Sequence, residues 1–236
     1  MSIPPATIQE KALVLEKVAK ALEGRYGVPH VDSPSDPLEV LISTILSQNT
    51  NDHNRDLAFE GLKKRFPDWN ALLEADGQEI AKAIRVGGLS RQKAIRIKDI
   101  LRWVRERWGS LTLAPICEMA TEDALRVLLG LRGVGLKTAK CVLAFGCGKD
   151  VFPVDTHILR IAKRLGFVPA KVAAEKAHEL LAPLIPPGKA LSLHLNLIRY
   201  GRQICRARGP RCSVCLFPEF CVFLLEQGSE TGVAQG

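Results

Sequence analysis

Four of the seven cysteines in this chain lie within seventeen residues, in the segment CRARGPRCSVCLFPEFC. They are Cys205, Cys212, Cys215 and Cys221, spaced C-x6-C-x2-C-x5-C. Disulfides are typical of short secreted chains with too little core, and structural zinc usually uses two close C-x2-C pairs, of which this segment has one. Four soft thiolates in one compact loop favour a cubane iron–sulfur cluster. On spacing alone, zinc and disulfides remain alternatives.

The segment LRGVGLKT, residues 131–138, joins two apolar stretches that have helical periodicity. Gly133 and Gly135 flank Val134, and glycine allows unusual backbone torsions and the close approach of another backbone. The second helix is expected to begin near Leu136, where free N–H groups and the positive end of the helix dipole would hold a phosphate. A tight turn between two helices, with glycines for geometry only, is the alternative interpretation of GVG.

Two residues that follow this turn in the sequence, eighteen positions apart, have side chains suited to catalysis. Lys137 follows the turn, and Asp155 in VFPVDTHILRIAKRLG stands at the expected N-cap of a helix. A free lysine amine has a pKa of about 10.4, and partial burial beside a helix N-terminus would lower it. Alone, Lys137 is interpreted as a phosphate-binding lysine and Asp155 as a plain cap. Together with the four-cysteine loop, in this order along the chain, they form a much more specific pattern.

Composition indicates a globular, basic chain, and a basic charge alone is equally compatible with a nucleic-acid partner and with no polyanionic partner at all. The net charge of +8 and the pI of about 9.2 suggest a polyanionic partner. The chain has eight Phe, two Tyr and three Trp, too few for a base-stacking platform, so nucleic acid should be bound mainly through backbone phosphates. No secretory signal or membrane-spanning run is recognisable. We therefore expect a cytoplasmic protein in a reducing compartment, associated with a bacterial or archaeal nucleoid when bound to DNA, with no membrane partner.

The chain is a succession of helical patterns with no alternating β-type runs, which predicts an all-α fold. Asp36 as a cap with Pro37 in the first helical position marks one clear helix start. Further helices are expected at 52–66, 78–86, 90–108, 121–130, 136–145, 156–165, 171–184 and 191–204.

These motifs together resemble endonuclease III, the iron–sulfur family within the helix-hairpin-helix DNA glycosylases, over about residues 20–225. The resemblance implies that Cys205, Cys212, Cys215 and Cys221 ligate a [4Fe–4S] cluster. It also implies that Lys137 is the nucleophile that attacks C1′ of the damaged nucleotide and that Asp155 is the catalytic carboxylate. The imine that forms would permit β-elimination, so the enzyme would also be an abasic-site lyase.

The resemblance further implies a subclass and a partner. Adenine glycosylases of the superfamily lack the lysine and carry a further C-terminal domain, whereas this chain continues for only fifteen residues after Cys221. We therefore expect a bifunctional enzyme that removes oxidised pyrimidines. We also expect a monomer whose partner is double-stranded DNA with a damaged base or an abasic site. Removal of thymine or uracil from mismatches is an alternative. A non-catalytic protein that binds abasic DNA with the same fold is another.

Several residues are implied to contact DNA. The segment ILSQNTND resembles the one whose amide side chain fills the gap left by a flipped nucleotide, which makes Gln48 and Asn49 equal candidates. GGLSRQKA resembles the segment with a hydrophobic wedge, here Leu89. The remaining candidates line the hairpin or the cysteine loop: Arg132, Gly133, Val134, Gly135, Thr138, Arg206, Arg208 and Arg211.

The expected organisation is a two-lobed helical fold. Residues 37–149 form a helical barrel with the helix-hairpin-helix at about 121–146; residues 1–36 and 150–225 form the cluster domain, and 226–236 a flexible tail. Three departures from the family pattern are Arg132, where proline is usual, Tyr200, where histidine is frequent, and the segment SQNTND at the gap-filling position. They bear on substrate preference and not on the class of reaction. The other cysteines are interpreted as small buried residues: Cys117, Cys141 and Cys147.

Overall fold

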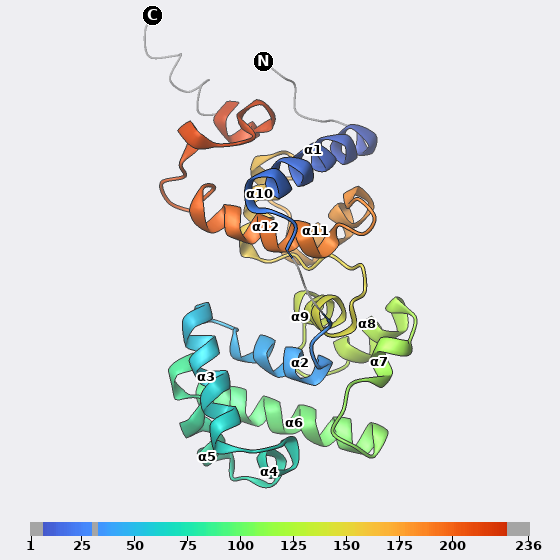
Figure 1. Cartoon of the computed structure of the whole chain (residues 1–236), viewed down its shortest axis with the longest axis vertical. Helices are drawn as coiled ribbons and strands as arrows, with labels where there is room; N and C mark the ends of the chain where they lie inside the picture. Colours follow the sequence, from blue (N-terminus) through green and yellow to red (C-terminus); the bar gives the residue numbers. More distant parts are fainter. Residues whose placement is uncertain (1–6, 30–32, 226–236) are drawn as a thin grey trace, which may run out of the picture. The chain divides into compact units, whose positions relative to one another are not determined.

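The structure is a computed structural model that describes residues 7–29 and 33–225, so the predicted tail at 226–236 lies outside the described residues. Every regular element within these ranges is helical, which confirms the predicted all-α class (Figure 1). The described chain divides into two compact units, residues 7–29 with 150–225 and residues 33–149. The second unit contains the hairpin, and the first contains Asp155 and the four-cysteine loop.

Residues 33–149 form ten helical elements. They are α2 (Pro37–Leu46), α3 (Asp52–Arg65), α4 (Trp69–Glu74), α5 (Gly77–Ala83), η1 (Arg85–Gly87), α6 (Ser90–Trp108), α7 (Pro115–Glu118), α8 (Thr121–Leu129), α9 (Leu136–Cys141) and η2 (Val142–Gly146), a turn of wider π-helix. Polar caps fix where they start: the Asp36 carboxylate accepts from the Leu38 amide over 2.7 Å, and Pro37 follows it. Helix α2 has its apolar face fully buried and packs against α3, α6, α9 and η2, which makes it the centre of this unit.

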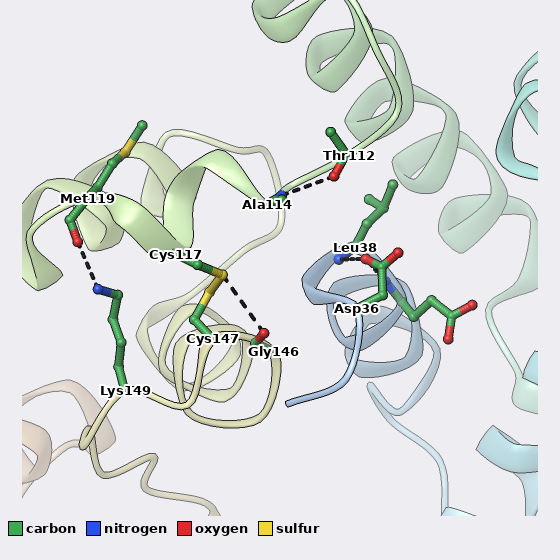
Figure 2. Close-up of a disulfide and its surroundings, with 10 residues drawn as sticks. Asp36, Leu38, Thr112, Ala114, Cys117, Met119, Gly146, Cys147 and Lys149 are labelled. Atoms are coloured by element: carbon green, nitrogen blue, oxygen red, sulfur yellow. Dashed lines mark hydrogen bonds between the residues drawn. A yellow bond between two sulfur atoms is a disulfide. The ribbon is translucent and has the colours of Figure 1, made fainter. Parts of the chain in front are cut away.

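A disulfide links Cys117, in α7, to Cys147, just after η2, across a sequence separation of 30 residues (Figure 2). The prediction that all three remaining cysteines are merely small buried residues is therefore wrong for this pair and holds for Cys141, which is 4 % exposed. The reason is tertiary: α7 packs against α8 and α8 against η2, which brings the Cα atoms of Cys117 and Cys147 to 5.0 Å. That distance suits a disulfide, and no sequence spacing shows it.

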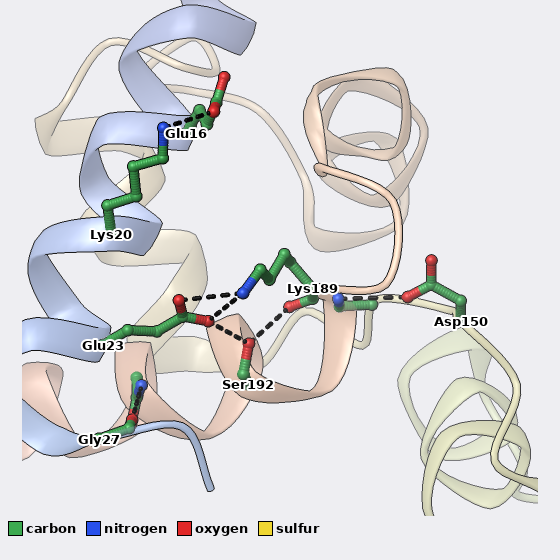
Figure 3. A network of polar contacts seen from close by, with 9 residues as sticks. Glu16, Lys20, Glu23, Gly27, Asp150, Lys189 and Ser192 are labelled. Atoms are coloured by element: carbon green, nitrogen blue, oxygen red, sulfur yellow. Dashed lines mark hydrogen bonds and ion pairs between the residues drawn. The ribbon is translucent and has the colours of Figure 1, made fainter.

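The other unit joins the N-terminal helix to the C-terminal helices. Its elements are α1 (Ile8–Tyr26), α10 (Thr156–Arg164), α11 (Ala174–Leu181), η3 (Ala182–Leu184), α12 (Ala190–Gln203), η4 (Cys212–Val214) and η5 (Pro218–Phe220). Helix α1 packs on α12 and η3 around one apolar core. Figure 3 shows the polar contacts beside this core: both oxygens of Glu23 accept from Lys189 Nζ at 3.0 Å, and Ser192 donates to the same carboxylate.

In residues 7–29 and 33–225, no helix combines the length and the apolar character that crossing a bilayer requires.

Candidate active site and cysteine loop

The hairpin between α8 and α9 is a tight turn anchored from inside. Val134 is 6 % exposed, and its amide donates to the Leu131 carbonyl over 3.0 Å. Gly133 has a φ of +83°, and a Cβ there would collide with the guanidinium of Arg96. The flexible Arg96 side chain can move aside, so it is the positive φ that favours glycine at this position. Gly135 is the N-cap of α9, and no side chain caps the helix, so its first amides are available to an outside acceptor.

Lys137 is half-buried in the first turn of α9, and Arg132 is exposed at the start of the turn. Thr138 is only 6 % exposed, so its side chain is buried. A second lysine, Lys140, lies one turn further along the helix and is also half-buried; burial lowers its pKa below the ordinary value.

Asp155 is half-buried at the N-cap of α10, in the other unit. One of its carboxylate oxygens accepts from the Ile158 amide over 2.8 Å, which confirms the predicted capping role. The other oxygen makes no hydrogen bond within the described residues, so it is available to act on a substrate. Burial lowers the pKa of nearby Arg160, while the negative charges of Cys205 and Asp155 act in the opposite direction. Arg160 therefore links the electrostatics of the capping carboxylate to those of the cysteine loop.

Two arginines of α10 hold the cysteine loop. Arg160 donates to the carbonyls of Cys205 (3.0 Å) and Gly201 (2.9 Å). Arg164 donates to the sulfur of Cys205 (3.2 Å) and to the carbonyl of Arg206 (2.8 Å). Sequence reasoning missed both residues, although their spacing of four places them on one face of a helix.

Hydrogen-bond donors are also directed at the sulfur of Cys215. The buried Tyr200 hydroxyl donates to Cys215 Sγ over 3.0 Å, and the Phe217 amide lies 3.4 Å from the same sulfur. Burial raises the pKa of the Cys221 thiol, and the charges of Cys215, Cys205 and Cys212 raise it further. The four sulfurs therefore influence one another's ionisation. Among the described residues, however, no three cysteine, histidine or carboxylate side chains converge closely enough to hold a metal ion.

The charged and apolar candidates for DNA contact lie on the surface. Arg206, Arg208 and Arg211 are all exposed on the cysteine loop. Leu89 is 52 % exposed immediately before α6, and Asn49 is exposed just after α2. Gln48 is half-buried instead, because its side-chain amide donates to the Gly133 carbonyl over 3.2 Å and accepts from Arg96. The structure thus joins the predicted gap-filling segment to the hairpin turn.

Comparison with known proteins places this chain. Residues 42–187 match the model of the HhH-GPD superfamily of base excision DNA repair proteins. Endonuclease III of Thermotoga maritima is 34 % identical over 215 residues, which cover 91 % of this chain and 95 % of the relative. Endonuclease III of Sulfolobus acidocaldarius is 33 % identical over 192 residues, 79 % of this chain and 82 % of the relative.

Solved structures show the same fold. A non-covalent endonuclease III–DNA complex aligns with a TM-score of 0.78 at 24 % identity, over 92 % of this chain and 98 % of that one. A thermostable thymine-DNA glycosylase aligns with a TM-score of 0.76, also at 24 % identity and with the same coverage of both chains. The family model, the curated relatives and the fold agree, and the chain belongs to the endonuclease III family of the HhH-GPD superfamily of base excision DNA repair proteins.

Proposed function

We propose that the chain is a bifunctional DNA glycosylase and abasic-site lyase of base excision repair that removes oxidised pyrimidines from double-stranded DNA. The observation that carries the proposal is the position of Lys137, half-buried in the first turn of α9 directly after a glycine turn. That helix has no side-chain cap, so its first amides suit a backbone phosphate. A phosphate bound there would bring a nucleotide close to the amine.

In the proposed reaction, the amine nitrogen of Lys137 attacks C1′ and the glycosidic bond breaks. The base leaves with the electrons of that bond and takes up a proton. The free carboxylate oxygen of Asp155 accepts the proton of the amine or stabilises the positive charge on the sugar. The sugar ring then opens: the C1′–O4′ bond breaks, O4′ takes up a proton, and the lysine nitrogen forms a C=N bond to C1′, which is the imine. Loss of the C2′ proton from this imine then breaks the C3′–O bond and releases the 3′ phosphate.

DNA would be held largely without reading its sequence. The uncapped amides of α9 and the exposed Arg132 supply hydrogen bonds and charge to phosphates at the hairpin. Gly133 and Gly135 allow the backbones to approach, and buried Val134 keeps the turn rigid. On the cysteine loop, the exposed Arg206, Arg208 and Arg211 would add further phosphate contacts.

The residues of the loop suit a [4Fe–4S] cluster held by Cys205, Cys212, Cys215 and Cys221. This inference rests on the donor set: four thiols with N–H and O–H groups directed at two of the sulfurs, as thiolate ligands require. A bound cluster would supply folding energy to a segment that otherwise consists of short turns. Its proposed role is structural, to fix the loop and its arginines.

Borohydride trapping tests the proposed chemistry. The reagent reduces an imine, so the wild-type enzyme should form a stable adduct with an abasic strand. Lys137→Gln should abolish the adduct while DNA affinity is largely kept, since most phosphate contacts come from other groups. Lys140→Gln is the matched control, because Lys140 is half-buried on the same helix, and it should still form the adduct. Trapping by Lys137→Gln at the wild-type rate would refute the assignment.

Asp155→Asn separates binding from chemistry. The amide keeps one capping oxygen but loses the negative charge, so DNA binding should persist while single-turnover base release slows by about 10²- to 10⁴-fold. Full activity of Asp155→Asn would remove the carboxylate from the mechanism.

A panel of duplexes, each with one lesion, tests which damaged base is the substrate. Faster release of thymine or uracil opposite guanine than of oxidised pyrimidines would favour a mismatch glycosylase, and a non-catalytic binder would release no base.

A further inference from the structure

Two surface residues have an unusual backbone conformation. Asn49 has a φ of 53° and Leu89 a φ of 46°, and they are the non-glycine residues with positive φ in the described chain. Such torsions are uncommon outside glycine and persist where neighbouring structure holds them, frequently at ligand-binding positions. Both side chains are exposed, one in the loop between α2 and α3 and the other between η1 and α6.

One buried ammonium group connects these two loops. Lys93, in the first turn of α6, is 1 % exposed, and its Nζ donates to the carbonyls of Leu46 and Gly87, each over 2.7 Å. Leu46 is the last residue of α2, three positions before Asn49, and Gly87 lies two positions before Leu89. The backbone amide of Lys93 also donates to the Leu89 carbonyl over 3.0 Å, which connects the loop to the first turn of α6.

The environment of Lys93 supports a specific role. Its Nζ has two carbonyl acceptors and no carboxylate partner within residues 7–29 and 33–225. Burial lowers the pKa of Lys93, and the positive charge of Arg96 lowers it further. A buried lysine is unfavourable unless its hydrogen bonds are retained, and here both of them connect the two loops. The backbone at Gly87 also packs closely on α3, since a Cβ there would lie 3.1 Å from the Cβ of Ala58.

The two candidate amides differ in how they are bound. Both ends of the Gln48 amide are engaged, one with the Gly133 carbonyl and the other with Arg96. Gln48 would have to break both contacts to enter DNA. The Asn49 side chain makes no hydrogen bond within the described residues and is exposed. Gln48 therefore connects its loop to the hairpin, whereas the Asn49 side chain can extend into DNA without breaking a hydrogen bond of the described residues.

We propose that Lys93 is a positioning residue that fixes the separation of the two loops, so that Asn49 and Leu89 enter the DNA helix as a pair. The inference rests on the proposed function only in assuming that a nucleotide is extruded from the duplex. Extrusion requires unstacking, and two side chains held at a fixed distance stabilise the opened helix better than two that move independently.

Fluorescence of 2-aminopurine tests the proposal without catalysis. The 2-aminopurine is placed opposite a tetrahydrofuran abasic analogue, which has no base to release, so no reaction occurs. Its emission rises when inserted protein side chains separate it from the bases on which it stacks. The wild type should produce the rise, and Lys93→Met should lose most of it while binding measured by anisotropy is retained. Lys98→Met is the matched control, since Lys98 also donates from α6 to a carbonyl, that of Ala75, outside both loops. A full rise with Lys93→Met would overturn the proposal.

The loop residues provide a second test that does not depend on how well Lys93→Met folds. Asn49→Ala should abolish the rise and Gln48→Ala should keep it; the reverse result would refute the assignment of Asn49. With Lys93→Met, excision of a paired lesion should fall about tenfold, as for loss of a hydrogen bond to a charged group. Trapping on a single-stranded abasic site should not change. If the wild type traps no DNA but still gives the fluorescence rise, the proposed chemistry fails and the loop proposal stands.

Discussion

The hydroxyl of Tyr200 donates a hydrogen bond to the sulfur of Cys215 over 3.0 Å and accepts one from the Leu216 amide over 3.0 Å. Tyr200 is 1 % exposed, and its ring packs on Phe217. Burial and the hydrogen bond to Cys215 raise the pKa of Tyr200 far above its ordinary value, so the phenol stays protonated and remains a donor. Tyr200 therefore connects α12 to the cysteine loop through the sulfur of Cys215 and the amide of Leu216.

Tyr200→Phe should destabilise the protein measurably. The change removes one hydroxyl and leaves the Leu216 amide without its acceptor, which costs about 1–3 kcal/mol of unfolding free energy. Chemical denaturation measures the loss. Tyr26→Phe is the control, because the Tyr26 hydroxyl bonds to Gln203 at the surface and its loss should cost less than about 1 kcal/mol. Equal losses of unfolding free energy for the two variants would mean that the contact with the cysteine loop stabilises the protein no more than a surface hydrogen bond does.

Breaking the disulfide should loosen the hairpin. The bond between Cys117 and Cys147 encloses α8 and α9, and its sequence separation is 30 residues. Loop-closure entropy for about 30 residues corresponds to about 3–4 kcal/mol of stability. Cys117→Ser should therefore unfold at lower denaturant concentration than the oxidised wild type. Addition of a thiol reductant should lower the wild type to the level of the variant and leave the variant unchanged. Free thiols at both positions in the purified wild type would contradict the bond.

The arginines of the cysteine loop should set part of the salt dependence of DNA binding. Arg206, Arg208 and Arg211 are exposed, and each phosphate contact contributes about 0.9 to the slope of log affinity against log salt. Replacing all three by alanine should flatten the slope by up to about 2.7. A charge-matched control replaces three exposed lysines outside the loop: Lys17, Lys20 and Lys176. If both triple variants flatten the slope equally, net charge rather than contact at the loop is responsible.

Leu89→Ala should slow the processing of a stably paired lesion more than the processing of an abasic site. A stably paired lesion must be extruded against full stacking, whereas a ready-made abasic site has already lost its base. Single-turnover rates on the two duplexes should therefore fall more for the paired lesion. Ile95→Ala removes another exposed apolar side chain, 60 % exposed on α6, and should leave the ratio of the two rates unchanged. Equal losses on both duplexes with Leu89→Ala would argue against a wedge.

Local signals were read well from the sequence because they act within a few residues. Asp36 and Pro37 start α2 where predicted, and Asp155 caps α10. Contacts between distant segments were not visible. Arg164 reaches Cys205 across 41 residues, and the disulfide closes across 30. Lys93 also gave no signal, since a lysine in a helical pattern is expected at the surface and only packing of α2, η1 and α6 buries it.

The pH dependence of stability should reveal the half-buried amine of Lys140. Burial lowers its pKa in the folded state, so below that pKa the folded protein bears the full cost of a desolvated ammonium. As pH rises through the folded pKa towards the ordinary value of about 10.4, the folded state releases its proton before the unfolded state does, and the cost disappears. Lys140→Met should therefore raise the unfolding free energy at neutral pH.

That gain should shrink as the pH approaches the ordinary lysine pKa, and denaturant titrations from neutral to alkaline pH measure it. Lys64→Met, at an exposed position on α3, shows the effect of removing a surface charge alone. A gain for Lys140→Met that stays constant with pH would point to better packing of the methionine instead. A loss of stability at neutral pH would mean that the ammonium of Lys140 has a favourable partner when the protein is folded.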